Sequence, residues 1–482
     1  MPVLGATGNV LRYLRNPIAR AGELFARYGR VASLVRAPTR IANPGPGWGT
    51  GALRTATGAG TVLVTGADHN REILTQHERF HMIALPGRLY PVGEVSERKK
   101  PLTRMFTGLF HVNGDEHRRH RRLLMPAFLR SQIESYAADM TNIAEDTVAR
   151  FRVGEVRDVH ADMTELTLRV ATKTLFGEDE GERGVELARL MQDWLLTMFS
   201  PWMLLPHLDL PKSPYRHFLD LTRAIDAKTA EMVQAKRKRR VPGSRDMLSA
   251  LIDARDEDGS ALDEDEIIGH TGVIFAAGHE TSTNALAWTL FLLSQHPGVA
   301  RDLADEIEPA CRGGAPSVDA LAKLTLLDGV VTESMRILPP VPFHPRIIAE
   351  DSELGGYSLP AGSELFLSIF HMHHDPAVFP EPRRFNPRRW ETAKPSVFEY
   401  NPFSAGPRMC IGASFALLEI KIALAALLSK YRFELPDQAN VDPRVAITMA
   451  PAHGLPLRVT RRADISRPGR ARGRIRDLVQ LS

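Results

Sequence analysis

The segment that decides the fold of this chain is Phe403-Ser404-Ala405-Gly406-Pro407-Arg408-Met409-Cys410-Ile411-Gly412. It lies directly before an apolar stretch, from about Gly412 to Lys430, that predicts a helix. A cysteine at a helix N-terminus lies near the positive end of the helix dipole and near unpaired N–H groups, and both favour the thiolate. The two glycines leave room for a flat cofactor, and Arg408 can bind a carboxylate. The alternative is a buried cysteine that acts as a small hydrophobic residue.

Five fixed positions, F-x-x-G-x-R-x-C-x-G, would agree by chance in about one in ten million windows at average residue usage. The segment resembles the haem-binding loop of the cytochrome P450 family, which holds its haem through a cysteine thiolate. The resemblance implies that Cys410 binds the iron of haem b, that Phe403 packs near the sulfur, and that Arg408 binds a haem propionate. It also implies the family's fold, which is mainly α with small β-sheets.

Length alone would suggest about three domains of ~150 residues each. The resemblance spans about residues 10–460, so it implies one catalytic domain over residues 1–460. Residues 461–482 are basic and rich in Gly and Arg, and we expect a disordered tail there; partner binding is the alternative. Since too few residues remain for a flavin or ferredoxin module, the resemblance implies a separate ferredoxin or flavodoxin with an NAD(P)H-dependent reductase.

The longest helical pattern runs from about Asp263 to His296, where Pro297 ends it. Its centre is almost uncharged, which is typical of a helix buried on all sides, so a carboxylate there is costly without a purpose. The segment Ala277-Gly278-His279-Glu280-Thr281-Ser282 resembles the family's oxygen-activating motif A-G-x-[DE]-T-[TS]. The resemblance implies that Ala277 contacts the haem and that Glu280 and Thr281 deliver protons. A core helix with one satisfied glutamate is the alternative.

His117 and Arg121 are four residues apart, so they share one helix face. They resemble the H-x-x-x-R with which the family contacts the haem propionates, and Arg346 resembles a third propionate contact. A solvated basic face is the alternative. The remaining basic residues of this helix would either steer an acidic redox partner or simply be solvated; these are Arg118, Arg119 and Arg122.

Three further residues resemble the family's structural Glu–Arg–Arg network. Glu333 and Arg336 match E-x-x-R, a weak signal by itself. Arg384, in Pro382-Arg383-Arg384-Phe385, resembles the arginine of the family's P-E-R-F segment. We expect these three residues to hold the fold and not to catalyse.

Composition narrows the class of protein. Acidic and basic residues almost balance, at 57 against 61, so we expect no nucleic-acid binding. The two cysteines, Cys311 and Cys410, make no disulfide framework and suggest a reducing compartment. The N-terminus lacks a signal-peptide pattern, and no stretch reaches the ~20 apolar residues of a membrane span. We therefore expect a cytoplasmic protein without a transmembrane anchor.

The resemblance implies a monooxygenase that inserts one atom of O2 into an organic substrate. Apolar residues in the proline-rich break after residue 197 suit an apolar substrate, although ordinary packing or a shallow membrane contact would use the same types: Met198, Phe199, Trp202, Met203 and Leu204. Two alternatives remain open, a peroxide-driven enzyme of the same fold and a non-catalytic haem sensor or carrier. The pair Glu280–Thr281 argues against both.

Overall fold

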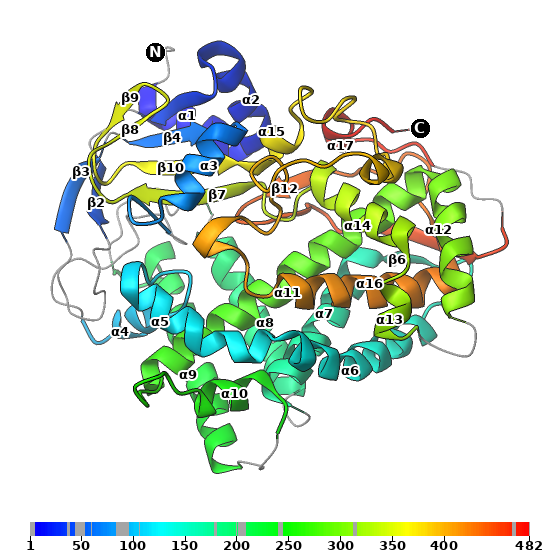
Figure 1. The fold of residues 1–482 in the computed structure, drawn as a ribbon, viewed down its shortest axis with the longest axis horizontal. Coiled ribbons are helices and arrows are strands. Elements are labelled where there is room, and N and C mark those ends of the chain that lie inside the picture. Colours follow the sequence, from blue (N-terminus) through cyan, green and yellow to red (C-terminus); the bar gives the residue numbers. More distant parts are fainter. Residues whose placement is uncertain are drawn as a thin grey trace.

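The computed structural model is mainly helical with small β-sheets, as the sequence predicts (Figure 1). It describes residues 5–35, 39–43, 54–58, 60–82, 96–105, 107–177, 181–198, 200, 209–239, 244–311, 316–464 and 469–481. In these ranges the helices are α1 (Gly5–Arg15), α2 (Pro17–Tyr28), α3 (Ala67–Thr75), α4 (Lys100–Met105), α5 (Gly114–Leu124), α6 (Arg130–Ala149), α7 (Val159–Phe176), α8 (Gly181–Met198), α9 (Pro214–Lys238), α10 (Met247–Asp253), α11 (Glu264–Gln295), α12 (Pro297–Ala310), α13 (Val318–Leu321), α14 (Thr325–Ile337), α15 (Ile369–His373), α16 (Ala413–Lys430) and α17 (Ile475–Leu478).

The principal sheet has the strand order β1-β4-β10-β7-β5 and lies at one side of the helical part (Figure 1). Its β4–β10 pair is parallel, and its other pairs are antiparallel. The strands are β1 (Val31–Val35), β2 (Thr39–Asn43), β3 (Arg54–Gly58), β4 (Thr61–Val64), β5 (Phe80–Met82), β6 (Val156–Asp158), β7 (Phe343–Ile348), β8 (Ser352–Leu354), β9 (Tyr357–Leu359), β10 (Glu364–Ser368), β11 (Tyr431–Glu434), β12 (Pro443–Val445), β13 (Met449–Pro451) and β14 (Pro456–Arg461).

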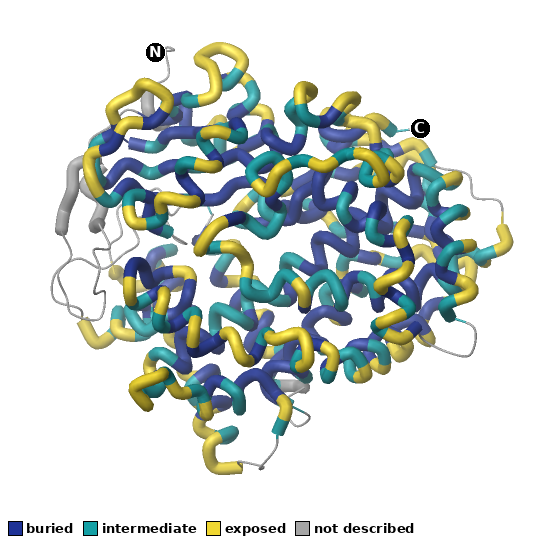
Figure 2. The backbone as a smooth tube through the Cα atoms, viewed as in Figure 1, coloured by how far each residue is buried: buried dark blue, intermediate teal, exposed yellow. Residues whose placement is uncertain are grey.

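Helix α11 crosses the middle of the molecule and confirms the predicted central helix (Figure 1). A capping box starts it: the Glu266 N–H donates to the Asp263 carboxylate, and the Asp263 N–H donates to the Glu266 carboxylate, each at 2.8 Å. Pro297 begins the next helix, so α11 ends at Gln295. The second half of α11, from Ser282 to Gln295, is buried on every side, as Figure 2 shows for the centre of the molecule.

The end of the chain differs from the expected disordered tail. Residues 469–481 are ordered, and their apolar side chains Ile475 and Val479 are buried at 0% and 1% exposure. The Arg472 N–H donates to the Ala439 carbonyl at 2.8 Å, and the Gln480 N–H donates to the Arg383 carbonyl at 2.8 Å. For residues 469–481 the structure therefore differs from the expectation, because burial of a few apolar residues among the many arginines stabilises an ordered segment.

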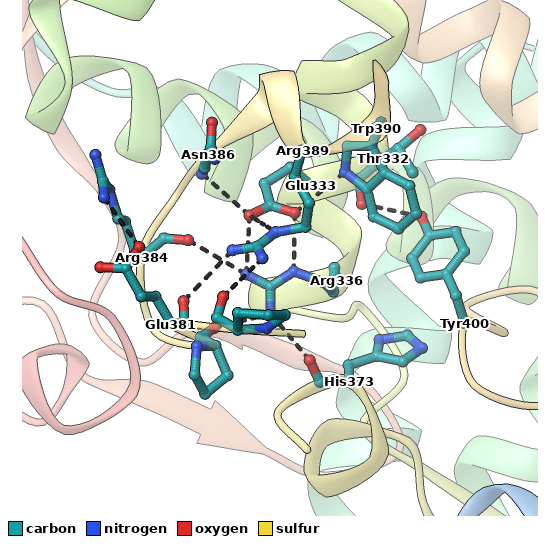
Figure 3. Close-up of polar contacts among 12 residues, drawn as sticks. Thr332, Glu333, Arg336, His373, Glu381, Arg384, Asn386, Arg389, Trp390 and Tyr400 are labelled. Atoms are coloured by element: carbon teal, nitrogen blue, oxygen red, sulfur yellow. Dashed lines mark hydrogen bonds and ion pairs between the residues drawn. The ribbon is translucent and has the colours of Figure 1, made fainter. Parts of the chain in front are cut away.

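A buried ion pair within α14 is hydrogen-bonded to segments that precede the cysteine loop in the chain (Figure 3). Glu333 and Arg336 have fully buried side chains, and two Arg336 nitrogens donate to the Glu333 carboxylate at 2.8 and 2.9 Å. Arg336 also donates to the His373 carbonyl at 2.9 Å. His373 in turn accepts the Asn401 N–H at 3.1 Å, and the Tyr400 hydroxyl donates to the Thr332 carbonyl at 2.9 Å. The pair thus braces the chain just before the cysteine segment.

The third member of this network is Arg389 and not Arg384, which corrects the sequence prediction (Figure 3). Arg389 Nε lies 3.3 Å from Glu333 Oε1 and its side chain is 10% exposed. The Arg384 side chain is 57% exposed and pairs with Glu381 at 3.0 Å. The sequence contains Pro-Arg-Arg-aromatic twice, at 382–385 and at 387–390. The second copy forms the 3-10 helix η6 (Pro387–Glu391), which packs on α14 and points its last arginine inward.

We expect Arg389→Ala to lower the free energy of unfolding by about 2–3 kcal/mol, because part of the charge of a buried carboxylate loses its partner. The matched control Arg384→Ala removes only an exposed ion pair and should change it by less than about 1 kcal/mol. Denaturant titration of both variants measures the difference. Equal effects would contradict the assignment of Arg389.

Candidate functional site

The cysteine segment forms a tight loop in front of α16. The Cys410 N–H donates to the Phe403 carbonyl at 2.8 Å, and the half-buried Phe403 packs against the main hydrophobic core. Gly406 has a φ of 67°, and a Cβ on it would lie 2.3 Å from the Leu74 carbonyl oxygen. The approach of α3 and the positive φ therefore require a glycine at this position.

Cys410 lies deep in the protein, yet it keeps a large accessible surface. A residue with both properties borders open space inside the molecule. Burial raises the pKa of the Cys410 thiol, while the Gly412 N–H and the charge of Arg121 lower it less strongly. The helix start alone therefore does not produce the thiolate that the sequence predicts. Its stabilisation requires a further positive charge at the sulfur, as a metal ion provides.

The structure brings together the four basic residues that the sequence singles out. Burial and the neighbouring Arg346 and Arg121 lower the pKa of Arg408 to about 9. Burial lowers the pKa of Arg346 to about 10. Burial, Arg408 and Arg121 lower the pKa of His117 to about 3, so His117 is neutral at pH 7. These pKa shifts indicate one electropositive cluster, in which the positive charges repel one another.

The hydrogen bonds of this cluster leave its charge uncompensated. Arg121 donates to the Met409 carbonyl at 2.8 Å, and Arg346 donates to the Pro345 carbonyl at 2.7 Å. Arg408 donates to the Leu109 carbonyl at 3.1 Å and to two further oxygens, those of Val112 and Asn113. In the described part of the chain, these arginines donate to neutral oxygen atoms, and His117 Nδ1 and Arg408 Nε have no hydrogen-bond partner. The cluster therefore fits a bound anionic group.

The predicted oxygen-activating segment lies on α11 as expected. The Thr281 hydroxyl donates to the Ala277 carbonyl at 2.7 Å, so both residues lie on one helix face. Ala277 and Thr281 keep accessible surface although α11 crosses the middle of the molecule. A Cβ added to Gly278 would meet no atom within 4 Å. This part of α11 therefore borders open space, while the Glu280 carboxylate accepts a hydrogen bond from Thr448 at 2.9 Å.

Asn113 is a residue of this site that the sequence analysis missed. Its side chain accepts from Arg408 and from the Met82 N–H, the latter at 2.9 Å, so it ties β5 and α5 to the cysteine loop. It occupies the N-cap position of α5, but its side chain makes no cap hydrogen bond. An asparagine before a predicted helix is usually an N-cap residue. Nothing in the sequence pattern therefore indicates that Asn113 links β5 and α5 to the cysteine loop.

The remaining arginines of α5 bind the protein's own carboxylates. Arg118 pairs with Glu78 at 2.5 Å and with Asp115, Arg119 pairs with Glu266 at 2.9 Å, and Arg122 pairs with Asp256 at 2.6 Å. They therefore do not form an uncompensated patch that would steer an acidic partner.

Of the expected substrate-contacting residues, Met198 is buried in the main core, and Phe199, Trp202, Met203 and Leu204 lie outside the described residues.

Comparison with known proteins decides the family. Residues 62–454 match the family model described as "Cytochrome P450". The chain belongs to the cytochrome P450 family. Pentalenene oxygenase of Streptomyces avermitilis is 32% identical over 74% of this chain and 80% of its own length. Cytokinin hydroxylase of Arabidopsis thaliana is 30% identical over 82% of this chain and 78% of its own. The fold also matches the retinoic acid-bound cyanobacterial CYP120A1 structure, with a TM-score of 0.79, 23% identity, and coverage of 96% of this chain and 97% of that one.

Membership establishes the enzyme class and the cofactor of this P450. The family consists of haem-thiolate proteins that carry haem b on a cysteine, and this chain is a P450 monooxygenase. The described residues fit that cofactor, since the cluster of uncompensated cations suits the two haem propionates and the accessible Cys410 suits the iron. Across the described ranges, no helix is long and apolar enough to cross a membrane.

We expect Arg408→Ala to weaken haem binding roughly tenfold to a hundredfold, because a charge-assisted hydrogen bond contributes about 1.5–3 kcal/mol. Arg118→Ala is the matched control, since this exposed arginine already pairs with two carboxylates. Transfer of haem to an excess of a haem-scavenging globin measures both variants. Retention of haem by Arg408→Ala at the wild-type level would exclude a propionate contact.

Proposed function

We propose that Cys410 is the axial ligand of the haem iron, and that His117, Arg121, Arg346 and Arg408 hold the propionates while Phe403 and Ala277 contact the ring. The observation that carries this proposal is the combination of an accessible, deeply placed sulfur with an uncompensated cationic cluster. When bound, haem supplies an iron centre for oxygen activation, and thiolate donation favours O–O cleavage.

In this proposal Glu280 and Thr281 are the catalytic residues that move protons. Both are partly accessible, and a hydroxyl next to a carboxylate can pass protons through water. At rest the Thr281 hydroxyl donates to a helix carbonyl, so it must turn away from Ala277 to act. A Cβ built on Gly278 would meet no atom within 4 Å, so the helix is not closely packed at that position.

The proposed reaction inserts one oxygen atom of O2 into an apolar organic substrate and reduces the other to water. Two relatives from Streptomyces support this class, since their names denote oxidation of pentalenene and of cyclooctat-9-en-7-ol. We propose a cyclic hydrocarbon or its alcohol as the substrate class here. Electrons would come from a separate ferredoxin or flavodoxin with an NAD(P)H-dependent reductase. A cytoplasmic location stays a prediction, which the two free cysteines favour.

The first test is the absorption spectrum of the reduced, carbon-monoxide-bound protein. We expect the strongly red-shifted Soret band of thiolate-ligated haem, and we expect Cys410→Ala to abolish it. Cys311→Ala is the matched control and should leave the band unchanged, because Cys311 lies at the end of α12 and does not take part in the proposed site. A band at the position of histidine-ligated haem in the wild type would overturn the proposal.

We expect Thr281→Ala to raise the fraction of NADPH electrons that end in hydrogen peroxide about threefold or more, because proton delivery contributes strongly to catalysis. Thr281→Ser retains the hydroxyl and should stay near the wild type. Peroxide and NADPH are measured together with a surrogate ferredoxin and reductase. An unchanged peroxide fraction in Thr281→Ala would remove Thr281 from the proton path and favour a peroxide-driven enzyme or a haem carrier.

A further inference from the structure

A β-hairpin made of β12 and β13 reaches Glu280, the carboxylate at the centre of α11. Strands β12 and β13 pair in antiparallel fashion, and the Ala446 N–H donates to the Thr448 carbonyl across the turn at 2.9 Å. From this turn the Thr448 hydroxyl donates to Glu280 Oε1 at 2.9 Å. Thr448 is 6% exposed, so this hydrogen bond is shielded from solvent and its geometry is well defined.

Two neighbouring hydrogen bonds fix the position of the hairpin along α11. The buried Trp288 indole N–H donates to the Met449 carbonyl at 2.8 Å. The Met449 N–H donates to the Pro340 carbonyl at 2.8 Å, which ties the hairpin to the segment before β7. Both bonds involve the residue directly after Thr448. The hydroxyl is therefore held at Glu280 by the backbone on which it stands and not by its own bond alone.

The ordered C-terminal segment holds the base of the same hairpin. The Val441 N–H donates to the Arg472 carbonyl at 2.9 Å, and the Arg474 N–H donates to the Asp442 carboxylate at 2.7 Å. The Arg474 side chain donates to the Pro443 carbonyl at 3.1 Å. Burial of Ile475 fixes this segment against the core. A chain of contacts thus runs from the C-terminal segment through the hairpin to the carboxylate on α11.

We propose that Thr448 is a positioning residue for proton delivery. It holds the Glu280 carboxylate through Oε1 and leaves Oε2 to exchange protons. The C-terminal segment, residues 469–481, keeps the hairpin in the position that this hydrogen bond requires. The inference rests on the proposed proton-moving role of Glu280. A carboxylate on a flexible side chain has several rotamers. A fixed hydrogen-bond donor at one oxygen selects one of these rotamers, and the other oxygen can still bind and release a proton. Thr448 does not touch the reacting atoms in this assignment.

The test uses the haem-loaded full chain with NADPH, a surrogate ferredoxin and its reductase, and no added substrate. Dioxygen then takes either two electrons and two protons to give hydrogen peroxide, or four of each to give two waters. We expect Thr448→Val, which keeps the shape of the side chain, to raise the peroxide fraction about twofold or more and to change the solvent isotope effect on NADPH consumption. Thr448→Ser should restore both values.

Two more variants separate positioning from general damage. Thr460→Val is the matched control, because the Thr460 hydroxyl on β14 has no hydrogen-bond partner in the described structure. Arg474→Ala removes side-chain contacts at the base of the hairpin, and we expect a smaller change in the same direction. Wild-type values in both Thr448→Val and Arg474→Ala would overturn the inference. A wild type that shows no thiolate spectrum or consumes no NADPH would instead overturn the proposed function.

Discussion

The buried ion pair between Glu333 and Arg336 is the interaction on which the arrangement of the site depends. Removing both charges from water is expensive, and the pair is tolerated because nearly every polar atom on it has a partner. The Glu333 carboxylate accepts from Arg336, Arg389, the Trp390 indole and the Asn386 N–H (Figure 3). Three of these partners, Asn386, Arg389 and Trp390, come from the segment that leads to the cysteine loop. Satisfying one buried charge therefore fixes the path of the chain towards Cys410.

The site itself shows the opposite situation, because its charges are not satisfied within the described protein. Arg121, Arg346 and Arg408 raise the cost of one another's charge, and burial raises the pKa of Cys410. An anion would relieve the first cost and a metal cation the second. Haem offers both in one molecule, with carboxylates at one edge and iron at its centre. Bound at the proposed site, the family's cofactor would supply the charges that this part of the protein requires, and its binding should stabilise the fold.

The sequence was most informative where function constrains several residues at fixed spacing. The cysteine segment and the α11 segment predicted the family, the central helix and the placement of Thr281 with Ala277. Arg389 was missed because the chain carries two copies of Pro-Arg-Arg-aromatic, and only the packing of η6 on α14 decides between them. Asn113 and the C-terminal segment were missed for a related reason. Their partners lie well outside the local stretch of sequence, and local composition does not report such contacts.

The position of Glu280 shows how a charge can be placed near the middle of a helix whose second half is fully buried. Charge is disfavoured along the second half of α11, where every residue from Ser282 onward is buried. Glu280 lies just before this boundary, where the helix still borders open space and a hairpin brings the Thr448 hydroxyl. One turn further along, at Asn284, the helix is fully buried. The boundary between the open and the packed half of α11 therefore limits where an acid can stand, and the hairpin determines how it is held.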